Sequence, residues 1–139
     1  MPINSKLIIA FFSFFMVGNV QATVFSCPAI NKIKQNKADS GYSYKANAGD
    51  SMKWTGENPY AEKNDLQNIS FKEAYILNVK NLIACDYVGH DNASGMRMSL
   101  TLKLPVKPLG KYWQDEKQSD GSVFVHCTSS YPEDCIFSQ

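Results

Sequence analysis

The stretch MRMSLTLKL, residues 96–104, carries the clearest pattern in the chain. Its side chains alternate strictly between two groups, the apolar Met96, Met98, Leu100, Leu102 and Leu104 and the polar Arg97, Ser99, Thr101 and Lys103. Because successive side chains of a strand point to opposite faces, this alternation predicts a strand with one buried face and one face in water. Half-buried strands are typical of antiparallel sheets. The stretch therefore predicts an antiparallel sheet at the centre of the fold.

The flanking segments add further strands, interrupted by turn residues and by two polar loops. Tyr42 and Tyr44 alternate with small residues, and Met52 and Trp54 do so after the turn NAGD, which together predict a β-hairpin. Two prolines within residues 105–110 end the central strand. The expected strands cover residues 41–46, 51–56, 69–77, 81–88, 96–104 and 122–127, and the expected loops cover residues 57–67 and 112–121.

The segment CPAINKIKQN, residues 27–36, predicts the one helix of the domain. Pro28 stands at a first-turn position, and Ile30 and Ile33 are three residues apart, which places them on one side of a helix. We therefore expect a helix from Pro28 to about Asn36. The predicted fold class is α+β, an antiparallel β-sheet of five or six strands with this short N-terminal helix packed on one face.

Four cysteines, Cys27, Cys85, Cys127 and Cys135, predict two disulfides that staple the domain. The favoured pairing is Cys127 with Cys135, which closes a short turn, and Cys27 with Cys85, which ties the N-terminal segment to a central strand. The swapped set, Cys85 with Cys127 and Cys27 with Cys135, remains an alternative. The cysteines lack the paired short spacing of a zinc site, so we expect no metal and no cofactor.

The N-terminus has the pattern of an export signal. Lys6 precedes an apolar run at residues 7–17, and small residues follow at Val20-Gln21-Ala22. The run is too short to span a bilayer, which takes about 20 apolar residues, so no stable membrane insertion is expected. We interpret residues 1–22 as a cleaved signal peptide and residues 23–139 as a single domain of the periplasm. Lipidation of Cys27 is the disfavoured alternative, because bulky Phe25 stands close before it.

Charge excludes one class of partner. Lys6 is the one charged residue in the leader, and residues 23–139 carry 13 acidic and 13 basic side chains. A neutral domain has no long-range attraction for phosphate backbones, and the lysines and arginines form no cluster with interleaved aromatic residues. We therefore expect no nucleic-acid partner.

Catalytic motifs are missing from the sequence, and we expect a protein that is not an enzyme. The chain lacks a nucleophile elbow, a metalloprotease motif, a phosphate-binding loop and a calcium loop. His90 and Asp91 form the one adjacent acid–base pair, and the surrounding GHDNASG favours a hairpin turn. His126 lies near the end of an expected strand, which favours an ordinary sheet position. No catalytic residue is assigned.

Aromatic residues at strand edges and in loops are the best binding candidates: Trp54, Tyr60, Tyr112, Trp113 and Tyr131. Tryptophan and tyrosine are frequent anchors of protein interfaces. The alternative is that Trp54 and Trp113 fill the ends of a small core. Tyr131 lies in the loop TSSYPED between Cys127 and Cys135, and a loop pinned by a disulfide can bind a partner at low entropic cost.

The order of the signal peptide, CPAI, KWTG, FKEA before LIACDYVG, and a final HC…DCIF resembles small exported bacterial domains of unknown function. It also resembles the EirA-type periplasmic proteins associated with type IV (Dot/Icm) secretion in intracellular bacterial pathogens. The resemblance implies a periplasmic, non-enzymatic factor that supports a secretion apparatus or intracellular growth.

Three functional hypotheses follow. The first is an interaction module that contacts a protein partner in the bacterial envelope and can form a homodimer. The second is an inhibitor of a lysozyme or protease that acts through the TSSYPED loop. The third is a small hydrolase or a glycan-binding domain, which would need a pocket that the sequence does not show.

Overall fold

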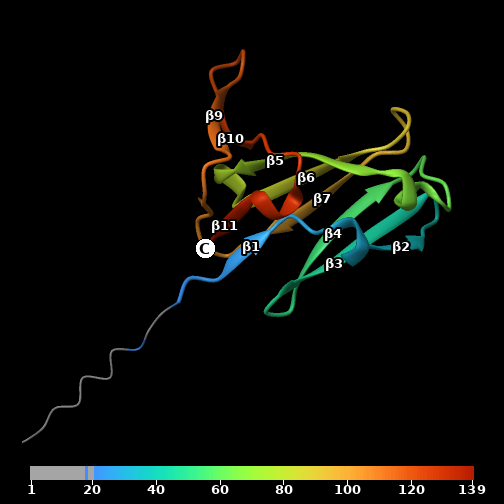
Figure 1. The fold of residues 1–139 in the computed structure, drawn as a ribbon, viewed down its shortest axis with the longest axis horizontal. Coiled ribbons are helices and arrows are strands. Elements are labelled where there is room, and N and C mark those ends of the chain that lie inside the picture. The colour runs from blue at the N-terminus through green and yellow to red at the C-terminus, as the bar shows by residue number, and fades with distance from the viewer. Residues whose placement is uncertain (1–17, 19–20) are drawn as a thin grey trace, which may run out of the picture.

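The computed structural model describes residue 18 and residues 21–139. The predicted signal peptide, residues 1–22, lies almost wholly outside these described residues. Figure 1 shows the described part as strands joined by turns, with the β9–β10 hairpin projecting from one end. In the part of the chain that the structure describes, there is no helix of the length and apolarity that crossing a membrane requires.

Eleven strands between residues 21 and 139 form two antiparallel sheets. The larger sheet has eight strands, in the order β2 (Lys34–Lys37), β3 (Tyr42–Gly49), β4 (Met52–Asn58), β7 (Met96–Thr101), β6 (Leu82–Val88), β5 (Ser70–Leu77), β10 (Val123–Cys127) and β9 (Trp113–Lys117). The smaller sheet has three strands, in the order β1 (Val24–Ser26), β11 (Ile136–Ser138) and β8 (Lys107–Pro108). The described chain is therefore mostly β, and the predicted α+β class is wrong.

The predicted helix at residues 28–36 does not form, and residues 21–139 contain no α-helix. A single 3-10 turn, η1 (Ile30–Lys32), takes its place, with the Ile33 amide donating to the Ile30 carbonyl at 3.0 Å. The chain then extends into β2, which pairs with β3. Pairing satisfies backbone groups that the edge of β3 would otherwise expose, and this gain outweighs the weak preference of two isoleucines for a helical face.

The central strands are predicted correctly. The β3–β4 hairpin, β5, β6, β7 and β10 all lie within or close to the expected ranges. Met96, Met98 and Leu100 of β7 are buried as the alternation requires. The strand nevertheless ends at Thr101, and Leu104, expected on the buried face, is 58% exposed.

Residues 112–121, expected to be a loop, contain the edge strand β9, which pairs along its whole length with β10. The sequence Trp113-Gln-Asp-Glu-Lys117 lacks the apolar alternation that reveals a half-buried strand. Charged side chains are typical of edge strands, because they discourage pairing with other molecules. The polar composition that concealed β9 therefore suits its position in the sheet.

The strand β5 contains a bulge. In a regular strand Phe71, Glu73, Tyr75 and Leu77 would share one face. The pairing with β6 shifts register between Phe71 and Glu73, so Phe71 is buried while Glu73 and Tyr75 lie on the other face. A bulge inserts one residue and thereby reverses the direction of the side chains that follow it.

The small sheet covers one face of the large sheet, which we call the inner face. Phe25 of β1 stacks on Phe137 of β11 with ring centroids 5.6 Å apart, and Phe137 meets the edge of Trp54 of β4 at 6.0 Å. These three side chains are at most 5% exposed. Gly56 of β4 lets this strand approach β7, since a Cβ there would collide with the Arg97 carbonyl oxygen. No strand among the described residues covers the opposite, outer face.

The two disulfides join Cys27 to Cys85 and Cys127 to Cys135, which confirms the favoured pairing. Cys85 and Cys127 belong to the large sheet, whereas Cys27 directly follows β1 and Cys135 directly precedes β11. Both bonds therefore fasten the small sheet to the inner face of the large one. Two structural disulfides are consistent with an exported protein of an oxidising compartment.

Candidate functional site

The two tryptophans belong to the packed interior and its border. Trp54 is 1% exposed and lies wholly within the core. Trp113 is half-buried at the start of β9, and its indole Nε1 donates to the Ile136 carbonyl oxygen at 2.7 Å. That hydrogen bond ties the edge of the large sheet to β11. Trp54 therefore offers no surface to a partner, and Trp113 offers only part of its ring.

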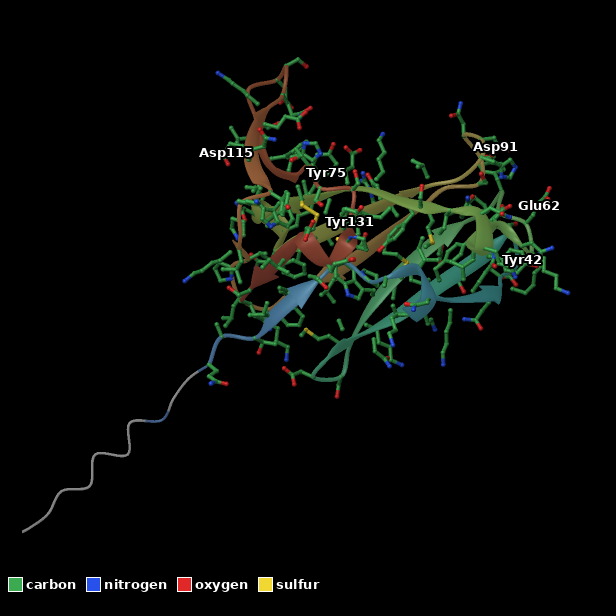
Figure 2. The ribbon with its side chains drawn as sticks, viewed as in Figure 1. Tyr42, Glu62, Tyr75, Asp91, Asp115 and Tyr131 are labelled. Carbon is green, nitrogen blue, oxygen red and sulfur yellow. A yellow bond between two sulfur atoms is a disulfide. The ribbon has the colours of Figure 1, made fainter. Side chains whose placement is uncertain are left out.

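Three tyrosines complete the predicted set, and they do not form one patch with each other. Tyr112 is partly buried, whereas Tyr60 is 77% and Tyr131 64% exposed. Tyr60 shares a hollow with Glu62 and Asp91. Figure 2 shows Glu62 and Asp91 at one end of the molecule and Tyr131 nearer its middle. The two exposed rings are therefore separate candidates.

The loop from Thr128 to Asp134 holds Tyr131 in place. The Cys127–Cys135 disulfide closes it, and Ser129 Oγ donates to Asp134 Oδ2 at 2.7 Å while accepting from the Tyr131 amide at 3.1 Å. The 3-10 turn η4 (Pro132–Asp134) follows, with the Asp134 amide donating to the Tyr131 carbonyl at 3.1 Å. The loop thus displays an exposed tyrosine on an ordered backbone.

A polar cluster on the outer face was not found from the sequence as a set. We call it the outer-face cluster, and it consists of Glu73, Tyr75, Asp86, Arg97, Glu116 and His126. Strand pairing places these residues side by side, because His126 is opposite Tyr75, and Glu73, Asp86 and Arg97 are opposite one another in turn. No local sequence signal could have revealed it, because its residues come from five strands and the β5 bulge is not visible in a period-2 pattern.

His126 lies between two carboxylates. Its Nε2 is 3.0 Å from Glu73 Oε2, and its Nδ1 is 2.8 Å from Glu116 Oε2. The Tyr75 ring stacks on the imidazole with centroids 4.6 Å apart. Both ring nitrogens therefore lie within hydrogen-bond distance of a carboxylate, and the imidazole connects β5, β10 and β9.

Arg97 and Asp86 form a second fixed pair on the same face. Arg97 Nε donates to Asp86 Oδ1 at 2.6 Å and Arg97 Nη2 donates to Asp86 Oδ2 at 2.8 Å, the bidentate geometry that orients both groups. Hydrogen bonding to Asp86 raises the pKa of Arg97. Burial, followed by the negative charge of Glu73, raises the pKa of Tyr75 to about 12, so its phenol is neutral at physiological pH.

An open hollow of about 360 Å³ lies above these pairs. Tyr75, Leu77 and Phe124 contribute apolar surface to its lining, together with the small side chain of Ala84. Its polar lining consists of Glu73, Asp86, Arg97, Glu116 and Gln118. Glu116 belongs to β9 and Gln118 to the turn between β9 and β10, so this hairpin forms one side of the hollow.

His90 and Asp91 lie in the turn between β6 and β7 and are largely exposed. Their side chains approach to 3.2 Å. Ser94 Oγ accepts from the Asp91 amide and donates to the Asp91 carbonyl, both at 3.2 Å. The hydroxyl of Ser94 lowers the pKa of Asp91 through a hydrogen bond. These contacts stabilise the turn itself, as the sequence GHDNASG predicted.

Residues 19–138 match the protein family described as "Protein of unknown function (DUF3757)". The chain belongs to this family. No match was found among curated proteins, and none among solved structures. Among the described residues of this DUF3757 member, no three or more His, Cys, Asp or Glu side chains are grouped to hold a metal ion.

Proposed function

We propose that this DUF3757 protein is a periplasmic, non-enzymatic interaction protein. In this proposal it supports a type IV (Dot/Icm) secretion system and intracellular replication through contacts with a protein partner in the envelope, as the resemblance to EirA-type proteins implies. Self-association as a homodimer is compatible with this role.

The observation that carries the proposal is the pinned loop of residues 128–134. A disulfide and internal hydrogen bonds order this loop while Tyr131 stays 64% exposed. Ordering a flexible loop on binding costs free energy, and a loop that is already ordered avoids much of that cost. Exposed tyrosine is also a frequent interface anchor. These features support recognition of a protein.

The test is complementation of a gene-deletion strain, with effector translocation and intracellular replication measured. Wild-type protein should restore both readouts, and Tyr131→Ala should restore them less. Tyr60→Ala, which removes another exposed ring outside the loop, should match the wild type. If the deletion leaves both readouts unchanged, the secretion role is wrong. If Tyr131→Ala complements fully, the loop is not the contact.

The same loop supports a second candidate function, inhibition of a lysozyme or protease. Ordered loops that resist rearrangement suit insertion into an enzyme cleft, because little flexibility is lost on binding. Purified oxidised protein assayed against a panel of lysozymes and proteases decides this question. Inhibition that Tyr131→Ala abolishes would support it, and uniform absence of inhibition would remove it.

A further inference from the structure

The hollow on the outer face combines apolar and polar surface in a way that the proposed protein contact does not use. Tyr75 and Phe124 meet edge to face with centroids 6.2 Å apart, and both line the hollow. Binding sites for small ligands combine such apolar surface with a few fixed polar groups that orient the ligand. The volume of about 360 Å³ lies at the small end of the range for ligand sites, roughly 300–1,000 Å³.

The polar groups of the hollow are already oriented by one another. Asp86 holds Arg97 through two hydrogen bonds, and Glu73 and Glu116 both contact His126. Arg97 donates two of its five N–H groups to Asp86, so the others can donate to a ligand. Glu116 contacts His126 through Oε2, which leaves Oε1 as an acceptor. Tyr75 adds a neutral hydroxyl.

Mutual pairing also decides which charge the ligand carries. Asp86 is paired with Arg97, Glu73 contacts both Lys72 and His126, and Glu116 contacts His126, so each carboxylate already has a nitrogen partner. A cationic ligand would gain little from carboxylates that already have partners. A ligand rich in hydroxyl groups gains more, since each hydroxyl can donate to a carboxylate and accept from a guanidinium.

We propose that this hollow binds a sugar ring, with the apolar C–H face of the ring against Phe124 and Tyr75 and its hydroxyls on Arg97 and Glu116. The inference goes beyond the proposed protein contact, because it concerns a different surface and a different class of ligand. The third hypothesis from the sequence included a glycan-binding domain, which would need a pocket. The structure buries Trp54 in the core and provides this aromatic hollow elsewhere.

The test is a titration of the oxidised, isotope-labelled protein followed by two-dimensional amide NMR. The probes are cellobiose, diacetylchitobiose and maltose, and a tetralysine peptide serves as the cationic comparison. We expect at least one disaccharide to shift amides of β5, β6, β7 and β10 around the hollow. Phe124→Ala and Arg97→Gln should each weaken that binding about tenfold or more.

Lys45→Gln is the matched control, because Lys45 is exposed on β3 of the same sheet and does not line the hollow. It should bind like the wild type. The amide spectrum of each variant reports whether it is folded, so a loss of binding is separable from a loss of fold. Three results would overturn the inference: no disaccharide shifts any amide, the shifts lie elsewhere, or tetralysine occupies the hollow and the sugars do not.

Discussion

The two faces of strands β5, β6 and β7 are built from alternate residues of the same segments, yet they differ in burial and in polarity. The inner face carries Ala74, Ile76, Ile83, Cys85 and Met98, each at most 1% exposed. The outer face carries charged and aromatic side chains held in fixed pairs. Burial of apolar surface is the main source of stability, whereas exposed ion pairs add little. We infer that the inner face holds the fold and the outer face is free to serve recognition.

The largest expected difference between the faces lies on β4. Trp54 is 1% exposed on the inner face, and its neighbour Thr55 is exposed on the outer face. Trp54→Ala removes a large buried ring and should lower the free energy of unfolding by about 3–5 kcal/mol. Thr55→Ala should lower it by less than about 1 kcal/mol. Urea unfolding measures both, and equal losses would contradict the division between the faces.

The disulfides sharpen the comparison, because both fasten the small sheet to the inner face. The Cys27–Cys85 bond spans 58 residues and the Cys127–Cys135 bond spans 8. Replacing both cysteines of the long-range bond by alanine should lower the free energy of unfolding by about 4 kcal/mol. The same change at the short-range bond should lower it by about 2.6 kcal/mol, because a shorter loop loses less entropy when it is closed. Urea unfolding of the two double variants gives the order. A larger loss at the short-range bond would indicate that the loop of residues 128–134 contributes more to the fold than we infer.

The smallest expected effect concerns Tyr75 on the outer face at alkaline pH. The fold raises its pKa from 10.0 to about 12, mainly through burial and the charge of Glu73. The unfolded chain therefore loses this phenol proton at a lower pH than the folded chain does. The raised pKa of Tyr75 adds to the free energy of unfolding fully below pH 10, and this addition is lost as pH rises toward 12. Tyr75→Phe should lose less stability over this interval than the wild type.

Tyr60→Phe is the control for that experiment, since it removes a phenol far from the cluster, and it should follow the wild-type curve. Urea midpoints at pH 9, 10 and 11 compare the three proteins. A Tyr75→Phe curve that overlays the wild type would show that Tyr75 does not contribute to this pH dependence.

The strands with one apolar face could be predicted from the sequence, whereas the polar strands could not. Residues 96–101 and the β3–β4 hairpin carry alternation because one face is buried. The edge strands β2 and β9 are polar on both faces, so their pairing depends on the free edges of β3 and β10 rather than on any local signal. The isoleucines at 30 and 33 resembled a helical face, yet a 3-10 turn fits them equally well.

The disulfide pairing could be predicted from the sequence, whereas the candidate site could not. Cys127–Cys135 was favoured because it closes a short turn, and Cys27–Cys85 because it ties the N-terminal segment to a central strand. The structure has both bonds. The outer-face cluster draws on five strands, β5, β6, β7, β9 and β10, so no local motif could reveal it. The β5 bulge, which turns Glu73 outward, is itself invisible in a simple period-2 pattern.

An alanine scan of β7, from Met96 to Thr101, read by the free energy of unfolding, tests the division between the faces most directly. The account predicts alternation along the strand. Changes at the buried Met96, Met98 and Leu100 should each cost about 2–5 kcal/mol. Changes at Arg97, Ser99 and Thr101 should each cost less than about 1 kcal/mol. Costs without alternation, or with the larger values at the three polar positions, would contradict it.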